Sequence, residues 1–303
     1  MNSAASSSEP AEAGIGWPVA DAPAAPGPAP VRGVPVVDAT LAPPPSPRGP
    51  LPYRLATPAR FGHRLGRLGT HAWRGQRTIR DEFPALDTTA RTSRIRDWSA
   101  ELVQRCGIDL QVSGVPPTEP ALVAANHVSW LDIFAINAAR PVRFVSKAEA
   151  ASWPLIGPLV RGVGTLLIER ERAHDVVRVI REMAQSLQGG DAVGVFPEGT
   201  TTPGHALLPF HANLFQAACA ADVPVQPVLL FYADARSGRF SRAAAYVGDE
   251  TMLGSLWRLS AAPRLRIEVE FLAPIRSASR RALARDARDA IAERLDARLR
   301  DAR

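Results

Sequence analysis

The segment ALVAANHVSWLD, residues 121–132, indicates the fold class of this chain. Its first five residues form a short apolar run that ends at Asn126, which is typical of a buried strand in a parallel sheet. A helix is expected to begin at Ser129, because Ser129 and Asp132 have the spacing of a capping box. Asn126 and His127 are therefore expected in the turn at the carboxyl end of a strand, where open α/β sheets bind their ligands.

His127 and Asp132 form a candidate acid–base pair in this turn. Asp132 is expected in the first turn of the helix, where the helix dipole favours an ionised carboxylate. That carboxylate can accept a hydrogen bond from one ring nitrogen of His127, fix its tautomer and leave the other nitrogen as a base. On these residues alone, a capped helix preceded by a surface histidine explains the pattern equally well.

Short apolar runs recur from residue 110 onward, with helical periodicity between several of them. The expected strands cover residues 110–113, 121–125, 142–145, 164–168, 192–196, 225–231 and 265–272, and the clearest helices cover 174–187 and 277–302. Strands that alternate with helices predict an α/β fold with a mixed, largely parallel sheet flanked by helices.

Before residue 109 the chain is expected to divide into two segments. Residues 1–52 form a Pro/Ala-rich tail without periodicity, and half of the 28 prolines lie at or before Pro58, so disorder is expected there. Residues 53–108 are expected to form a basic helical segment, with helices near 59–76 and 90–107. Residues 109–303 are then a single folded domain.

The basic segment concentrates most of the net charge. Residues 53–112 carry eleven arginines and six acidic residues (11 − 6 = +5), compared with a formal charge of +6 for the whole chain. Basic amphipathic helices can adsorb on anionic membrane surfaces, where each arginine contributes about 1 kcal/mol. Ordinary solvated faces and nucleic-acid binding are the alternatives, but no nucleic-acid motif accompanies the charge. We expect a membrane-facing segment and no nucleic-acid partner.

The remaining composition narrows the class of protein. No apolar run reaches the roughly 18 residues of a membrane-spanning helix, and no secretory signal pattern is expected. The two cysteines, Cys106 and Cys219, are too few for a disulfide scaffold and lack the spacing of metal ligands. We expect two buried free thiols in a cytosolic protein, and no metal site.

Two further segments carry candidate site residues. Lys147 follows a predicted strand and is the only lysine among 36 basic residues, which favours a site that needs a compact charge, although one residue can also arise by chance. The segment from Trp153 to Arg170 is either a buried apolar hairpin-like segment or the wall of an acyl-chain site with a cation at its rim. Farther along, the predicted strand 192–196 continues into Pro-Glu-Gly, which suits close approach of backbone to a ligand but is also a common turn.

Four blocks together resemble the 1-acyl-sn-glycerol-3-phosphate acyltransferase (lysophospholipid acyltransferase) family. They are NHVSWLD (126–132), the segment from Lys147 to the Ile-Glu-Arg that ends at Arg170, FPEGT (196–200) and VPVQPV (223–228). The resemblance covers about residues 105–235. It implies transfer of a fatty acyl group from an acyl-CoA or acyl carrier protein thioester to the hydroxyl of a lysolipid, first of all lysophosphatidate to give phosphatidic acid. It also implies no further cofactor and peripheral attachment at the cytoplasmic face of the membrane.

The resemblance also implies roles for individual residues. His127 is the general base, Asp132 orients and charge-stabilises it, and Asn126 shapes the turn. Glu198 and Gly199 help to build the acceptor pocket, while Lys147 and Arg170 match basic, anion-binding positions. The implied substrate-binding residues are Asn126, Lys147, Arg170, Phe196, Pro197, Glu198, Gly199 and Thr200.

Two departures from the family pattern concern the acceptor and the membrane. Thr201 and Thr202 stand where the family usually has Arg and Ser, and the resulting FPEGTT resembles the branch that acylates lyso-ornithine lipid. An Arg-rich segment replaces the usual apolar N-terminal anchor. A lipase or thioesterase and a non-catalytic lipid-interface protein are the rival functions, although no G-x-S-x-G elbow occurs in the chain.

Overall fold

The computed structural model of the chain describes residues 56–152, 157–168 and 173–302. The predicted disordered tail over residues 1–52 lies outside these ranges, and so do Trp153 and Arg170. Lys147 is described as part of a strand, but its side chain is not.

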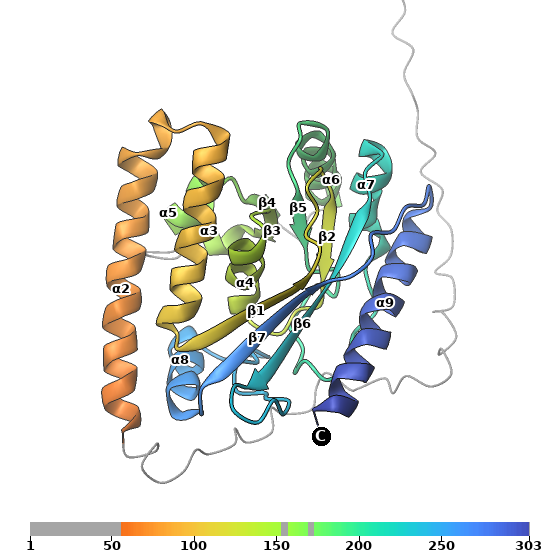
Figure 1. Cartoon of the computed structure of the whole chain (residues 1–303). Coiled ribbons are helices and arrows are strands. Elements are labelled where there is room, and N and C mark those ends of the chain that lie inside the picture. Colours follow the sequence, from red (N-terminus) through yellow and green to blue (C-terminus); the bar gives the residue numbers. More distant parts are fainter. Residues whose placement is uncertain (1–55, 153–156, 169–172, 303) are drawn as a thin grey trace, which may run out of the picture. The chain divides into compact units, whose positions relative to one another are not determined.

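A seven-stranded sheet runs through the described part of the chain, in the order β1-β7-β6-β2-β5-β3-β4 (Figure 1). Its strands are β1 (Ile108–Gly114), β2 (Leu122–Ala125), β3 (Arg143–Lys147), β4 (Leu166–Ile168), β5 (Val193–Val195), β6 (Val225–Asp234) and β7 (Leu265–Phe271). Neighbouring strands pair in parallel except β6 and β7, which are antiparallel. The prediction of an α/β fold with a mixed, largely parallel sheet is confirmed, and each expected strand has a counterpart.

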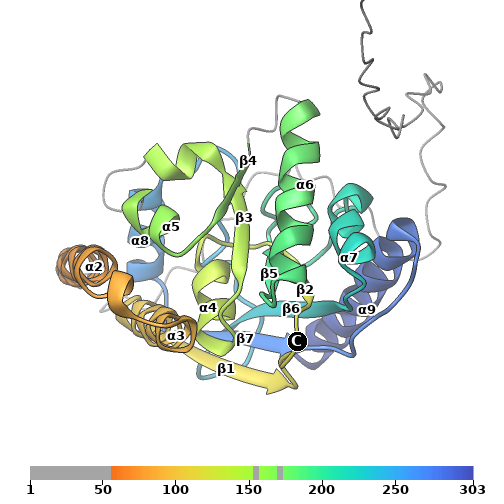
Figure 2. The same ribbon diagram turned by 90° about the horizontal axis from the view of Figure 1, so that it is seen from above.

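Helices cover both faces of this sheet, with α3, α4 and α8 on one face and α6, α7 and α9 on the other (Figure 2). The α-helices are α2 (Thr57–Asp81), α3 (Thr88–Arg105), α4 (Leu131–Ala139), α5 (Gly157–Gly162), α6 (Ala173–Gln188), α7 (Gln216–Ala221), α8 (Met252–Ala261) and α9 (Arg280–Asp301). Short 3₁₀ helices are η1 (Phe83–Ala85), η2 (Ala148–Ser152) and η3 (Ala212–Phe215). The predicted helices 174–187 and 277–302 correspond to α6 and α9.

The central strand β2 is buried on both faces because its side chains alternate between two apolar layers. Val123 and Ala125 join the layer beneath α3 and α4, whereas Leu122 and Ala124 join the layer beneath α6 and α7. All four side chains are inaccessible to solvent. This double burial explains why the strand appears in the sequence as a continuous apolar run.

Strand β7 is buried on one face and carries charged side chains on the other. Arg294 and Arg298 of α9 reach across to this second face, where Arg294 Nε lies 2.7 Å from Glu270 Oε1 and Arg298 Nη2 lies 2.5 Å from Glu268 Oε2. The strand therefore reads as an alternation of apolar and charged residues, and its partly buried carboxylates are paired by the helix that covers them.

The basic segment forms the two helices expected near 59–76 and 90–107, α2 and α3. They meet at His71 and Trp98, whose rings stack with centroids 4.5 Å apart. His71 Nε2 lies 3.0 Å from the Trp98 carbonyl oxygen, and Trp98 Nε1 donates to the His71 carbonyl at 3.3 Å. Burial lowers the pKa of His71, although the hydrogen bond to the Trp98 carbonyl and the nearby Glu101 carboxylate raise it. Trp98 also contacts Phe134 of α4, so α3 is joined to the sheet domain.

The cysteine prediction is right for one residue and wrong for the other. Both thiols are free, and Cys106 is fully buried at the end of α3, where burial raises its pKa to about 12. Cys219 is partly exposed because α7 covers the sheet with its other side, formed by Ala217 and Ala218. Among the helices described, none is long and apolar enough to cross a membrane.

Candidate active site

The turn after β2 is held by the side chain of Asn126. Asn126 Nδ2 donates to the Leu230 carbonyl of β6 at 3.0 Å, and its Oδ1 accepts from the Leu230 N–H at 2.8 Å. The side-chain amide thus continues the hydrogen bonding between β2 and β6 while the backbone turns away from the sheet. This geometry fits the turn-shaping role expected for Asn126, and it directs His127 out of the carboxyl edge of the sheet.

His127 and Asp132 are in direct contact, with Nδ1 of the imidazole 2.9 Å from Oδ2 of the carboxylate. Asp132 is fully buried in the first turn of α4, as expected. Its Oδ2 also accepts from the N–H groups of Val128 at 2.7 Å and Ser129 at 2.9 Å, and its Oδ1 accepts from the Tyr232 hydroxyl. Every one of these neighbours can donate, which is the environment that an ionised, acceptor-only carboxylate requires.

The start of α4 differs slightly from the prediction. The helix begins at Leu131, two residues after Ser129, and the Ser129 hydroxyl accepts a long 3.4 Å hydrogen bond from Leu131 N–H. The other half of the capping box is present, because Asp132 accepts from Ser129 N–H. From the first turn of α4, Asp132 thereby bonds both to the backbone that leads into the helix and to His127, so two contacts determine its position.

The contact with Asp132 determines the tautomer of His127. Because a carboxylate only accepts hydrogen bonds, Nδ1 must carry the proton, and Nε2 of the neutral ring is left with its lone pair. Nε2 has no hydrogen-bond partner among the residues that the structure describes, and the side chain is 19% exposed. The imidazole can therefore accept a proton from a bound molecule.

Aromatic stacking holds the plane of the imidazole. The ring of Phe196 lies against His127, with centroids 3.9 Å apart and planes inclined by 10°. Phe144 of β3 stacks in turn on Phe196 at 5.4 Å. Phe144 of β3 and Phe196, which directly follows the neighbouring strand β5, thus support one face of the His127 imidazole.

Glu198 connects the backbone of this turn to a second loop. Its Oε1 accepts from His127 N–H at 2.9 Å and its Oε2 accepts from Leu208 N–H at 2.8 Å. Arg288 of α9 donates to the carbonyls of Leu208 at 3.1 Å and Leu207 at 3.3 Å. Burial raises the pKa of Glu198 to about 7, although the two backbone donors lower it. In this arrangement both carboxylate oxygens face backbone, so the expected contact of Glu198 with an acceptor stays a prediction.

The rest of the FPEGTT segment is bound to the same turn. Thr202 N–H donates to the His127 carbonyl at 2.7 Å, and Thr201 donates its hydroxyl to the Tyr246 carbonyl. Tyr246 N–H in turn donates to the Val128 carbonyl at 2.8 Å. Three segments that are distant in sequence are therefore joined at His127.

Pro197, Gly199 and Thr200 complete the predicted set. The carbonyl oxygen of the buried Pro197 accepts a hydrogen bond from His211 N–H at 2.9 Å. Gly199 turns the chain with a φ of 74°, a conformation that favours glycine. Thr200 is exposed.

The comparisons with known proteins identify the family. The Acyltransferase family matches residues 109–230. A lyso-ornithine lipid O-acyltransferase of Pseudomonas aeruginosa is 39% identical over 227 residues, which cover 74% of this chain and 86% of the relative. This chain belongs to the acyltransferase family.

Other relatives of this acyltransferase are named for a different acceptor, 1-acyl-sn-glycerol-3-phosphate. A 1-acyl-sn-glycerol-3-phosphate acyltransferase of Neisseria gonorrhoeae is 42% identical over 168 residues, which cover 54% of this chain and 65% of the relative. The crystal structure of the 1-acyl-sn-glycerophosphate acyltransferase of Thermotoga maritima has the same fold, with a TM-score of 0.63 and 19% identity over 83% of this chain and 98% of that one. The resemblance noted from the four sequence blocks is confirmed.

The two basic residues predicted for this acyltransferase site are not described in enough detail to place their charges. Lys147 ends β3, where it pairs with Ile168 of β4, but its side chain is not described, and Arg170 lies outside the described residues. Their anion-binding role stays a prediction. Among the residues that the structure describes, no group of three or more His, Cys, Asp or Glu could hold a metal ion.

Sequence reasoning missed Tyr232, the fourth hydrogen-bond donor to Asp132. Tyr232 is fully buried in β6, within the apolar run VQPVLLFYAD, where its ring contributes to the core beside Leu230 and Val228. A tyrosine in such a run is expected to pack, and only the order of the strands brings its hydroxyl to α4. The one available signal is that a buried phenol needs a partner.

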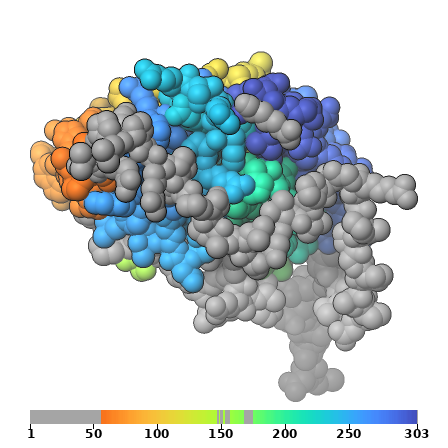
Figure 3. All heavy atoms as spheres, turned by 90° about the horizontal axis from the view of Figure 1, so that it is seen from below, coloured from red at the N-terminus to blue at the C-terminus, as the bar shows by residue number. Residues whose placement is uncertain are grey.

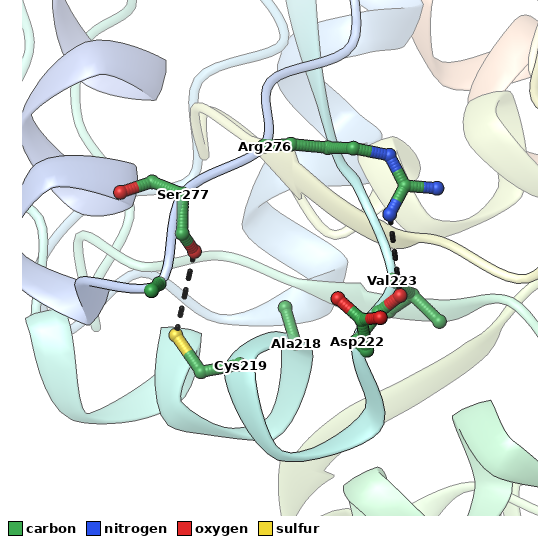
Figure 4. Close-up of a pocket in the computed structure, with 7 residues that line it drawn as sticks. Ala218, Cys219, Asp222, Val223, Arg276 and Ser277 are labelled. Atoms are coloured by element: carbon green, nitrogen blue, oxygen red, sulfur yellow. Dashed lines mark hydrogen bonds between the residues drawn. The ribbon is translucent and has the colours of Figure 1, made fainter.

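A surface hollow at the other end of the sheet has no part in this site. It is lined by residues of α7, the turn into β6 and the segment before α9, including Cys219, Asp222 and Arg276 (Figure 4). Val225, at the start of β6, pairs with Leu122 at the start of β2, so the hollow lies at the edge opposite to His127. The Arg276 guanidinium is already bonded to the Asp222 carbonyl at 3.2 Å.

Proposed function

We propose that this acyltransferase moves a fatty acyl group from an acyl-CoA or acyl carrier protein thioester to the free hydroxyl of a lysolipid, with His127 as general base. The observation that carries the proposal is the His127–Asp132 contact, which leaves Nε2 as a proton acceptor at the carboxyl edge of the sheet. The family membership supports the acyl chemistry, and the lysolipid names of the relatives support the acceptor class.

In this mechanism the protons and bonds balance without a covalent enzyme intermediate. Nε2 of His127 takes the proton of the acceptor hydroxyl as its oxygen bonds to the thioester carbonyl carbon. The carbon–sulfur bond then breaks, and the leaving thiolate takes the proton back from Nε2. Asp132 stabilises the imidazolium between these steps, and its own charge is held by the N–H groups of Val128 and Ser129 and by Tyr232. An activated thioester needs no nucleophilic Ser or Cys, which agrees with the absence of a G-x-S-x-G elbow from the sequence.

The test is release of free thiol from an acyl thioester, with and without a lysolipid. Transfer requires the acceptor, a thioesterase releases thiol without it, and a lipid-binding protein releases none. His127→Ala is expected to lower turnover by about 10²–10⁴-fold with an unchanged circular dichroism spectrum. A folded His127→Ala variant that keeps more than about a tenth of the wild-type rate would place the base elsewhere.

We infer that the acceptor is a lyso-ornithine lipid, with lysophosphatidate as the second candidate. Thr201 provides no cation at a position where a phosphate-binding arginine would form a planar, two-pronged contact, and its hydroxyl already donates to the Tyr246 carbonyl. The relative that is matched over 86% of its length is a lyso-ornithine lipid O-acyltransferase. The 42% identical relatives named for 1-acyl-sn-glycerol-3-phosphate support the second candidate, which the four sequence blocks placed first.

Thr201→Arg distinguishes the two acceptors. For an enzyme built for the zwitterionic lyso-ornithine lipid, the new cation raises the KM for that lipid and lowers the KM for lysophosphatidate, each by roughly tenfold. Thr201→Val is the matched control, because it removes the hydrogen bond to Tyr246 without adding charge. A wild-type enzyme that consumes lysophosphatidate and ignores the lyso-ornithine lipid would reverse the assignment.

The proposed reaction takes place at the cytoplasmic face of an anionic membrane, to which the protein attaches peripherally. Helix α2 carries six arginines and one acidic residue, Asp81, and this balance supports attraction to anionic headgroups. Such attraction weakens as salt screens it.

A further inference from the structure

Large apolar side chains are exposed together where α2 and α8 meet. Leu253 and Trp257 lie one turn apart on α8 and are 56% and 45% exposed, and Leu65 of α2 is 42% exposed. Phe61, one turn before Leu65, places its ring edge-to-face with Trp257 at 5.2 Å. We call these four residues the α2–α8 patch. The two helices adjoin in Figure 1, and Figure 3 shows the orange of α2 beside the blue of this part of the chain.

An exposed cluster of this kind indicates a binding surface. Single exposed apolar side chains are ordinary, but several of them where two helices distant in sequence meet are uncommon unless something covers them. The α2–α8 patch contains Trp257, and tryptophan, with its apolar ring and polar N–H, is favoured where an apolar phase meets water.

The charge around the patch identifies what can cover it. The part of α2 that flanks the patch, residues 57–76, carries Arg60, Arg64, Arg67 and Arg74 and no acidic residue. On α8, Arg258 is paired with Glu250, and the exposed Asp249 lies just before the helix, so the positive charge beside the patch comes from α2. Apolar side chains bordered by arginines match a surface with negative headgroups above an apolar layer.

The inner side of α8 connects the patch to the catalytic turn. Ser255 is fully buried and accepts from Trp130 Nε1 at 3.2 Å, and Trp130 lies three residues after His127. Leu253 and Trp257 flank Ser255 in sequence but point to the outside of the same helix. A bilayer bound at the patch would therefore lie against the helix that supports the turn carrying the base.

We propose that the α2–α8 patch docks this enzyme on an anionic bilayer, with Leu253 and Trp257 of α8 entering the interfacial layer together with Phe61 and Leu65. This goes beyond the electrostatic attraction of α2, because it assigns an apolar, salt-insensitive contribution to α8. It rests on the proposed function in one respect, namely that the acceptor is an amphiphile held in the membrane.

The test is flotation of the full chain with vesicles of phosphatidylcholine, with and without phosphatidylglycerol. Leu253→Asp and Trp257→Asp are each expected to lower the partition coefficient on the anionic vesicles by about tenfold or more, and the loss persists at high salt. Val177→Asp is the matched control, since Val177 is 50% exposed on α6, away from the patch, and its replacement leaves binding unchanged. Thermal unfolding and circular dichroism establish that each variant is folded.

A second measurement requires no disruptive substitution. Lipids with brominated acyl chains quench the tryptophan fluorescence of the bound wild type, and Trp257→Phe, which keeps the ring in the patch, loses a measurable part of that quenching. Folded α8 variants that float as well as the wild type, with undiminished quenching in Trp257→Phe, would overturn the proposal. So would variants that lose self-association while vesicle binding is unchanged, because the patch would then join two copies of the chain.

The binding assay contains no acyl donor and requires no turnover. A wild type that floats but transfers no acyl group would contradict the proposed function alone. A wild type that acylates detergent-dispersed lysolipid, while its α8 variants float normally, would contradict the docking proposal alone.

Discussion

Replacing Glu198 with glutamine tests how the turn that carries His127 is held in place. Glu198 is buried and accepts hydrogen bonds from His127 N–H and Leu208 N–H. Glutamine has the same size but does not titrate, and it offers one acceptor oxygen to two N–H donors. Relative to the ionised carboxylate the variant therefore loses one hydrogen bond, which costs about 1–3 kcal/mol. It also loses the pH dependence of the carboxyl group.

The pH dependence follows from the direction of the Glu198 pKa shift. Burial raises the pKa from its ordinary 4.5 to about 7, so the folded chain keeps this proton to a higher pH than the unfolded chain does. Glu198 thus contributes stability that is fully present below 4.5 and is lost as the pH rises through 7. Between about pH 5 and about pH 8 the loss is about 2.5 kcal/mol of unfolding free energy in the wild type, and it is missing in Glu198→Gln.

Urea unfolding at several pH values measures this difference. The free energy of unfolding of the variant, taken relative to wild type, is expected to rise by about 2.5 kcal/mol from about pH 5 to about pH 8. Glu119→Gln is the control, because Glu119 is an exposed glutamate outside the site, and its replacement leaves the slope unchanged. If the curves of wild type and Glu198→Gln run parallel over this range, burial does not dominate at Glu198 and the reasoning is wrong.

Two further substitutions address the hydrogen bonds that support His127. Asp132→Asn is expected to lower kcat by about 10²–10⁴-fold but less than His127→Ala does, because the base is kept while its tautomer and charge support are lost. An Asp132→Asn variant as active as the wild type would remove Asp132 from the mechanism. Tyr232→Phe removes one hydrogen-bond donor to the Asp132 carboxylate and is expected to lower kcat by roughly tenfold with little change in KM. Thiol release measured over a range of substrate concentrations gives both constants. An effect confined to KM would contradict a role of Tyr232 through Asp132.

The sequence predicted the strands and the His127–Asp132 contact because both depend on neighbours along the chain. The alternation of short apolar runs with helical stretches reports which side chains face a core, and that period is visible without coordinates. His127 and Asp132 are five residues apart across a strand-to-helix turn, so the geometry of a single turn brings them to 2.9 Å. The helix start was misplaced by two residues because Ser129 N–H bonds to the Asp132 carboxylate and the backbone enters the helix later.

Only the tertiary structure decided what surrounds that pair. Tyr232 reaches Asp132 across 100 residues, and it does so because β6 lies next to β2 in the sheet. Glu198 lies in a motif that the sequence singled out, but its two oxygens face the backbone of His127 and Leu208, a direction that no local pattern encodes. Helix α8 was not predicted, and its pairing with α2 depends on the path of the chain around the sheet. The period of apolar residues along the chain is set within a few residues. A hydrogen bond between distant segments depends instead on the order of the strands, and that order is set by packing of the whole chain.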